Sequence, residues 1–358
     1  MALELRPEPS AMAAWLSPLC AVIATVLVGL ALFTWLGKDP WQAMHVFFVK
    51  PLETRYGVGE WLLKAGPLML CAIGLAAGYR ANVWNIGAEG QLTMGGIAAG
   101  GLALASTDHA GGWLLPAMIV AGALGGMLWA AIPAWLRTRF NANEVLTSLM
   151  LVYVAGHALS YLVHGPWRDP EGFNFPQTRM FAEAAMWPIA FAQTRLNGGF
   201  ALDLMLLAVI GVVMSRSVIG FEMRVVGLAP AAAAYAGISS RRVLWIGMLV
   251  GGACSGVAGV NEISGPLGQL QPAISPGYGF AAIIVAFVGR LNAVGIALAS
   301  LLMSLLYLGG ESAQLALALP SAVTGLFQGA LLLFLLGSDV LIRYRLRFGA
   351  GAPAASAT

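Results

Sequence analysis

Apolar stretches long enough to cross a lipid bilayer recur along the whole of this chain. Of its 358 residues, 59% are apolar and 10% are charged, whereas a soluble domain carries about 25% charged residues. A soluble fold of this composition would expose far too much apolar surface to water. The bilayer is therefore the expected solvent, which excludes a soluble enzyme, a nucleic-acid binder and a disordered chain.

The apolar stretches predict an all-α polytopic membrane protein with about ten spanning helices of about 20 residues each. We expect one transmembrane domain over residues 1–358. Two of the helices, Leu92–Thr107 and Gly279–Val288, are short or interrupted by glycine, so we expect them to be broken or re-entrant. The predicted helices are Ala13–Leu36, Trp61–Tyr79, Leu92–Thr107, Trp113–Leu136, Val145–Val163, Phe200–Val218, Val243–Ser264, Gly279–Val288, Val294–Gly309 and Ala322–Ile342.

The distribution of arginines predicts the orientation. Ten spans place both chain ends on one side of the membrane, and most arginines, including Arg343, Arg345 and Arg347, then lie on that side. Basic residues accumulate on the cytoplasmic side, so we expect a cytoplasmic tail over about residues 1–12 and another over 343–358. Glu4 and Glu8 make a poor signal-peptide start, so the first apolar run is expected to be retained.

Residues 220–242 form a cytoplasmic connection that is more than a loop. Pro230 suits the first turn of a helix, four alanines follow it, and Gly237 suits the helix end. We therefore expect a short helix over 230–237. Such a segment suits either docking of a partner protein or adsorption to lipid headgroups.

A polar motif, Asn85-Ile86-Gly87-Ala88-Glu89-Gly90-Gln91, separates two apolar segments. It suits either a break whose polar groups line a pathway, with Asn85, Glu89 and Gln91 as candidates, or a cytoplasmic turn with Glu89 at a helix start. Near the other side, Asn261 and Glu262 lie close to Gln269 and Gln271. They suit either the outer mouth of a pathway or an external loop, and we favour the loop.

Other polar residues in the spans have simpler interpretations. We expect Lys64 to extend to the outer interface, Asp203 to meet water or a neighbour there, and His157 to form a hydrogen bond between helices. Val145–Leu149 resembles Ala322–Leu326, which hints at an internal repeat.

Enzymatic motifs are not found. The lysines do not form the Gly-Lys-Ser/Thr of a Walker A loop, and HExxH, GxSxG and metal-ligand spacings of cysteine or histidine do not occur. We expect no cofactor, no metal and no catalytic residues, and any ATP hydrolysis on a partner subunit.

Two motifs carry a resemblance to a known family. Arg80–Gln91 and Gly220–Gly227, the second followed by Ala232-Ala233 and Tyr235–Ile238, resemble permease subunits of ABC importers, in the branch shared by ribose, branched-chain amino-acid and nucleoside systems. The first motif is most similar to nucleoside-type members. One departure is Ala229, where relatives often have an asparagine that caps the following helix.

The resemblance implies a permease in a bacterial inner membrane. Its implied partners are a cytoplasmic ATP-binding subunit, a second and non-identical permease, and an extracytoplasmic solute-binding protein. The residues implied to contact the ATPase are Glu222, Arg224, Gly227, Pro230 and Gly237. The function implied is inward movement of a small neutral solute by alternating access, a nucleoside, purine or simple sugar.

Two alternatives stay open at this point. One is an amino-acid permease of the same branch. The other is a secondary transporter coupled to an ion, which would use Glu89 as its intramembrane carboxylate.

Overall fold

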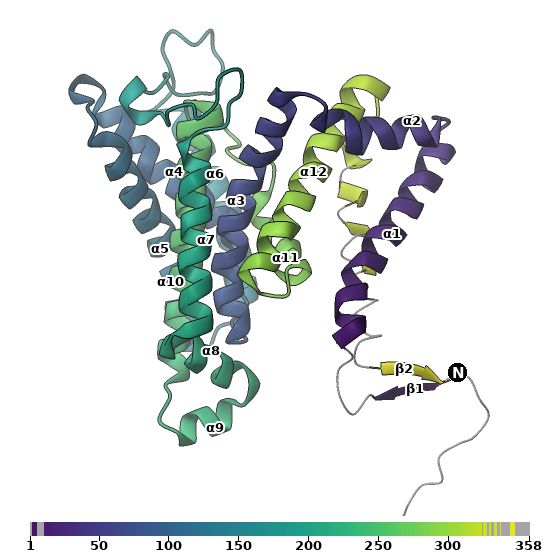
Figure 1. Ribbon diagram of the computed structural model, residues 1–358. Helices are drawn as coiled ribbons and strands as arrows, with labels where there is room; N and C mark the ends of the chain where they lie inside the picture. The colour runs from purple at the N-terminus through teal and green to yellow at the C-terminus, as the bar shows by residue number, and fades with distance from the viewer. Residues whose placement is uncertain are drawn as a thin grey trace, which may run out of the picture. The chain divides into compact units, whose positions relative to one another are not determined.

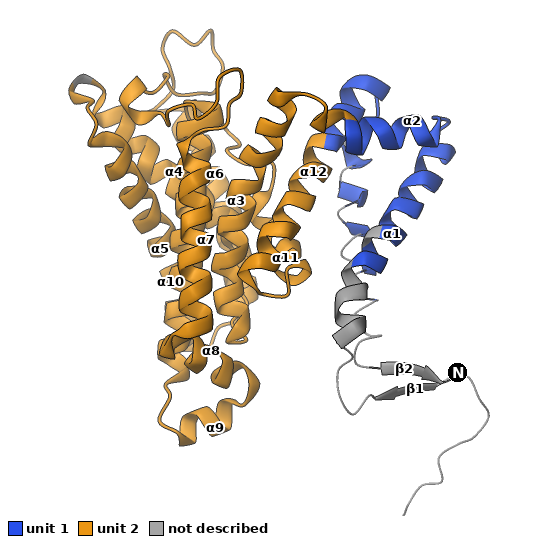
Figure 2. Ribbon diagram, viewed as in Figure 1, with its two compact units in different colours: residues 1–49, 309–358 blue, residues 50–308 orange. Residues whose placement is uncertain are grey.

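The computed structural model describes residues 2–5, 11–323, 325–327, 329–330, 333–334, 337 and 344–347. The chain is helical except for a short antiparallel pair of strands, β1 (Ala2–Leu5) and β2 (Tyr344–Arg347). It divides into two compact units, Met1–Val49 with Gly309–Thr358, and Lys50–Leu308 (Figure 2). We call them unit 1 and unit 2.

Unit 1 contains α1 (Ala11–Trp35), α2 (Pro40–Met44) and the π-helical turn η1 (His45–Val49). Asp39 caps α2 by accepting hydrogen bonds from two backbone N–H groups, and Pro40 occupies the first position of that helix. Phe33 and Phe47 pack against Phe327, with ring centroids 5.8 and 4.6 Å from that ring. This aromatic cluster is the core of unit 1.

Unit 2 contains most of the helices (Figure 1). Residues 165–197 form a long connection at one end of this unit, and α8 and α9 lie at the opposite end; we call these the loop end and the α9 end. Helix α12 belongs to unit 2 as far as Leu308. The elements are η2 (Lys50–Leu52), α3 (Arg55–Arg80), α4 (Ala88–Ala105), η3 (Thr107–His109), α5 (Leu114–Phe140), α6 (Glu144–His164), η4 (Glu183–Ala185), α7 (Gly198–Arg216), α8 (Val218–Leu228), α9 (Pro230–Tyr235), α10 (Ser240–Glu262), η5 (Ile263–Leu267), α11 (Tyr278–Val288) and α12 (Ala293–Leu317).

Six helices in the described part of the chain are long and apolar enough to cross a membrane: α3, α5, α6, α7, α10 with η5, and α12. The two helices predicted to be short or broken, α4 and α11, are not among them. The predicted helix Ala322–Ile342 lies largely outside the described residues, as do the predicted tails. The count of about ten spans, the single domain and the cytoplasmic placement of both ends stay predictions.

Capping residues explain where several helices begin and end. Thr54 accepts a hydrogen bond from the N–H of Gly57, so α3 begins at Arg55, six residues before the predicted start at Trp61. Asn143 caps α6 close to its predicted start, and Asn141 adopts a left-handed conformation that ends α5. Residues 40–52, which lie between two of the predicted helices, form three short helical elements.

The centre of unit 2 is α10, which packs on α5, α3 and α4. Glycines mark every one of these contacts. A Cβ on Gly256 would lie 3.2 Å from the Cα of Gly126 and would collide with the backbone of Gly122, both on α5. On the α3 side, Gly251 lies beside Gly74. Small residues let the backbones approach closely, which is how helices associate without a hydrophobic driving force in lipid.

A matched pair of substitutions tests this packing. We expect Gly256→Ala to lower the free energy of unfolding by about 1–3 kcal/mol, because the added methyl group meets backbone. Gly156, on α6, has open space where its Cβ would lie, so Gly156→Ala is expected to be neutral or to stabilise by up to about 1 kcal/mol. The measurement is the thermal midpoint of each purified variant in detergent. Equal midpoints would contradict the packing.

Candidate functional site

Asn85 and Gln91 form a closed pair of side-chain amides inside unit 2. Each donates to the other, at 3.0 and 3.1 Å, and both are almost completely buried. Asn85 lies beside Gly251, which is halfway along α10. The pair therefore lies at the middle of the helix bundle, away from its ends.

Glu89 joins the starts of two helices. It lies in the first turn of α4, and its Oε2 accepts a hydrogen bond of 2.7 Å from the backbone N–H of Gly279, in the first turn of α11. Ser275 caps α11 by accepting from the N–H groups of Gly277 and Tyr278. Helix N-termini carry partial positive charge, so one carboxylate stabilises two of them. Position 279 must be glycine because a Cβ there would collide with the backbone of Glu89.

A second polar cluster lies nearer the loop end. Asn261 donates to the carboxylate of Asp203 at 2.5 Å, and the indole N–H of Trp187 donates to Asn261 at 3.0 Å. Asp203 is 1% exposed and bonds Asn261, so of the two predicted alternatives, water or a neighbour, the structure has the neighbour. Asn261 and Glu262 are buried residues of α10, not part of an external loop.

Lys64 and Glu262 also belong to this region. Glu262 is buried at the end of α10, and Lys64 is half-buried in α3. The expectation that Lys64 extends to the outer interface stays a prediction.

The long connection at the loop end is fixed to α3 by an ion pair that the sequence analysis missed. Arg195 donates to both carboxylate oxygens of Glu60, at 2.7 and 2.5 Å. These contacts hold the pKa of the Arg195 guanidinium above its usual value. Glu60 is buried and Arg195 is half-exposed. The signal in the sequence was a carboxylate directly before the apolar run Trp61–Leu63, which indicates that Glu60 needs a partner but not that the partner is Arg195.

The segment predicted to bind an ATPase forms two helices instead of one. Ser217 caps α8, Ala229 adopts an extended conformation that ends it, and α9 begins at Pro230 as predicted. Gly237 has a φ of 78°, which suits glycine at a helix end. The residues most exposed here are apolar: Leu228 is 87% and Tyr235 is 97% exposed.

The five residues predicted for this surface do not all face outward. Arg224 and Pro230 are exposed and Glu222 is half-buried. Gly227 instead packs on α3, because a Cβ there would collide with the carbonyl of Arg80. Arg80 itself donates to the backbone carbonyls of Met214 and Leu291. Gly227 thus fixes α8 to the end of α3.

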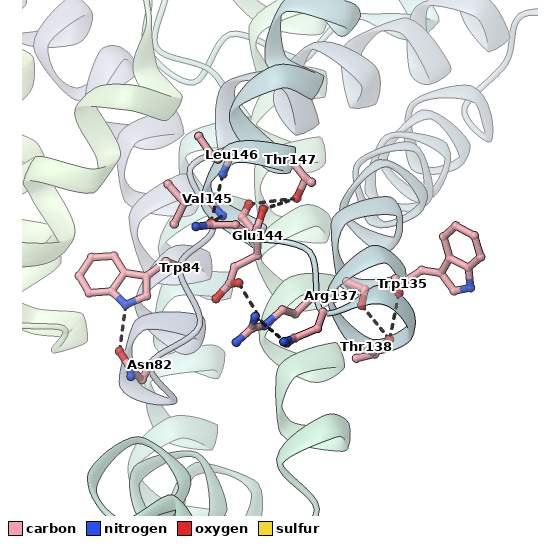
Figure 3. Close-up of polar contacts among 12 residues, drawn as sticks. Asn82, Trp84, Trp135, Arg137, Thr138, Glu144, Val145, Leu146 and Thr147 are labelled. Carbon is pink, nitrogen blue, oxygen red and sulfur yellow. Dashed lines mark hydrogen bonds and ion pairs between the residues drawn. The ribbon is translucent and has the colours of Figure 1, made fainter.

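The α5–α6 connection has its own polar contacts, shown in Figure 3 with the nearby Asn82 and Trp84. Arg137 forms an ion pair with Glu144 at 3.2 Å, and Asn143 caps α6. The indole of Trp84 donates to Asn82 at 2.9 Å. These contacts fix the turns to the neighbouring helices.

The described residues contain no cluster of three or more His, Cys, Asp or Glu side chains that could hold a metal ion.

Substitutions of Glu89 test its role as a joint between α4 and α11. Glu89→Ala leaves the Gly279 N–H without its acceptor, and we expect the unfolding free energy to fall by about 1–3 kcal/mol. Glu89→Gln keeps an acceptor oxygen and should lose less. Glu171→Ala, at an exposed loop position, is the control. Equal thermal midpoints for the two Glu89 variants and the control would contradict the joint.

Comparison with known proteins identifies the family. The family model described as "Branched-chain amino acid transport system / permease component" matches residues 57–336. A glucose ABC transporter permease of Haloferax volcanii is 38% identical, with 99% of this chain and 98% of the relative covered. A guanosine ABC transporter permease of Bacillus subtilis is 31% identical, with 94% and 95% covered. A nucleoside ABC transporter permease of Lactococcus lactis is 29% identical, with 82% and 83% covered. The chain therefore belongs to this family of ABC transporter permeases, as the two sequence motifs indicated.

Proposed function

We propose that this chain is the membrane-spanning permease subunit of an ATP-driven importer that moves a small neutral solute inward. The single observation that carries the proposal is its similarity, over almost the full length, to permeases named for glucose, guanosine and nucleosides. The solute is accordingly a nucleoside, a purine or a simple sugar. ATP hydrolysis takes place on a partner, because this chain has no Walker A loop.

The proposed assembly has four kinds of component. A cytoplasmic ATP-binding subunit binds the α9 end, a second and non-identical permease lies beside this chain, and a solute-binding protein delivers the solute from outside. The α9 end then faces the cytoplasm of a bacterial cell, and both chain ends lie on that side of the inner membrane. The arginines at this end, among them Arg80, Arg137 and Arg139, support the orientation.

The coupling surface is proposed to be α8 and α9. Glu222, Arg224, Pro230 and Gly237 belong to it, and exposed Leu228 and Tyr235 give it an apolar centre. Charges around an exposed apolar patch are typical of a protein interface. Gly227 contributes indirectly, because it seats α8 on the end of α3. A shift of α8 would therefore reach the membrane helices.

We propose that the predicted pathway residues hold the helices around the pathway in place and do not bind the solute. These residues are Asn85, Glu89, Gln91, Asn261 and Glu262. Four of the five are buried and Glu89 is half-buried. The bond from Gly279 to Glu89 joins α11 to α4, and the bond from Asn261 to Asp203 joins α10 to α7. Such contacts suit groups that hold these helices in register during alternating access. The engagement of Glu89 with Gly279 also disfavours an ion-coupled transporter. A carboxylate that carries a coupling ion must release its partners in every cycle.

Reconstituted transport tests the function. The chain is co-purified with the subunits that accompany it, placed in proteoliposomes and supplied with the solute-binding protein. We expect ATP-dependent uptake of labelled guanosine or glucose, and little uptake of labelled leucine. Glu89→Gln is expected to retain ATP-driven uptake. Uptake that needs an ion gradient and no ATP, or a preference for leucine, would overturn the proposal.

Negative charges introduced at two exposed positions test the coupling surface. We expect Arg224→Glu and Tyr235→Asp each to weaken binding of the ATPase at least about tenfold, as loss of a well-placed interface contact does. The control is Arg139→Glu, an exposed arginine at the same end, which should bind normally. Co-purification yield and solute-stimulated ATP hydrolysis are the measurements. Normal hydrolysis in the Arg224 and Tyr235 variants would place the coupling surface elsewhere.

A further inference from the structure

Three spanning helices of unit 2 leave most of their side chains uncovered: α5, α6 and α7. On α5 the exposed residues within the span are apolar, including Val120, Leu124 and Leu128. On α7 they are again apolar, including Val209 and Val212. Such surfaces suit contact with lipid chains.

The exposed face of α6 combines apolar residues, Leu146, Met150 and Val154, with polar ones. It carries Tyr153, His157 and Tyr161, spaced four residues apart and therefore aligned along one side of the helix. Tyr153 is 60% and Tyr161 is 71% exposed, and His157 is exposed between them. None of the three side chains forms a hydrogen bond with the part of the chain that the structure describes. The expectation that His157 bonds a neighbouring helix of this chain is therefore wrong. We call these three residues the α6 stripe.

The depth of the stripe makes lipid a poor neighbour. At a rise of about 1.5 Å per residue, α6 is about 31 Å long, close to the thickness of the hydrocarbon layer. His157 lies about 20 Å from the Glu144 end and about 10 Å from the His164 end. The imidazole is thus well inside the membrane and too short to extend to the interface. A polar ionisable group at this depth almost always faces protein or a water-filled cavity.

The chemistry of the stripe favours the water-filled cavity. Two phenol rings and an imidazole offer flat faces together with hydrogen-bonding groups at their edges. Beside His157, Gly156 has no heavy atom within 4 Å of where its Cβ would lie, so the described chain leaves this part of the face open. Flat faces and edge donors and acceptors are what a neutral ring compound with hydroxyl or amide groups requires.

We propose that the α6 stripe lines the path of the solute and contacts its ring during transport. This inference rests on the proposed function and deepens it, because it names the surface that the solute touches. The phenol rings stack against a nucleobase or the C–H face of a sugar, and the imidazole exchanges hydrogen bonds with ring nitrogens or hydroxyls. The buried cluster at Asn85 lies behind this helix, because the N–H of the adjacent Ile86 donates to Ser148 of α6.

Cysteine labelling tests the proposal without relying on transport. Exposed Cys20 is replaced by serine, while Cys71 and Cys254 are buried and stay. In this parent, His157→Cys is compared with Leu124→Cys on α5 and Val209→Cys on α7. The full complex in proteoliposomes is treated with a charged, membrane-impermeant thiosulfonate, with and without ATP. We expect Cys at position 157 to react at least about tenfold faster than Cys at the two control positions, because only water-exposed thiols form the reactive thiolate.

The imported solute provides the second readout. The compound that the parent complex takes up is expected to slow labelling at position 157 and to leave the background rate of the controls unchanged. If the cysteine at position 157 reacts as slowly as the cysteine at position 209, both with and without ATP, then lipid or a packed helix covers the stripe. That result would overturn the proposal. Rapid labelling that the imported solute does not slow overturns the contact with the ring.

Side-chain substitutions complete the test. His157→Leu should reduce uptake at least about tenfold, since it removes a hydrogen-bonding group from the path, and His157→Gln should restore part of it. Val209→Leu is the matched control and should transport normally. Normal uptake by His157→Leu would overturn the proposal. A parent complex that imports no solute at all would instead overturn the proposed function, and labelling would still decide whether the stripe faces water.

Discussion

Close approach of glycine-bearing backbones around α10 is the contact on which the rest of unit 2 depends. In lipid, apolar side chains gain nothing by leaving one apolar neighbour for another, so packing and hydrogen bonds must hold the helices together. Gly251 faces Gly74 on one side of α10, and Gly256 faces Gly126 on another. Because these backbones are close, short side chains such as Asn85 and Asn261 can connect neighbouring helices. The polar clusters form where glycines allow the helix backbones to lie close enough for short side chains to meet.

Four polar side chains inside the bundle are satisfied within the chain, and this changes what they do. Asn85 and Gln91 satisfy each other, Glu89 satisfies the start of α11, and Asp203 is bonded by Asn261. Unpaired, each would carry a large penalty in a medium of low dielectric constant. A motif rich in hydrogen-bonding residues need not face a solute. Here it supplies directional contacts that apolar packing lacks.

Local features of the fold were predictable from the sequence, and partners were not. Pro230 and Gly237 marked the bounds of α9 because their effects act within one helical turn. The shortness of α11 was likewise visible in its own residues. In contrast, the pairing of Glu60 with Arg195 joins residues far apart in the chain, and no local pattern encodes it. His157 was misjudged for the same reason, since its surroundings depend on how other helices are arranged.

One helix contacts both ends of unit 2. Near its start, Glu60 of α3 holds the connection at the loop end through Arg195, and at its last residue, Arg80 lies against Gly227 of α8. A continuous helix of 26 residues behaves as a rod about 39 Å long. A movement of the loop end can therefore reach α8 through α3. Pro67 interrupts the hydrogen bonding of this helix, because proline has no backbone N–H to form the hydrogen bond to the preceding turn. Pro67 is therefore the point at which α3 resists bending least.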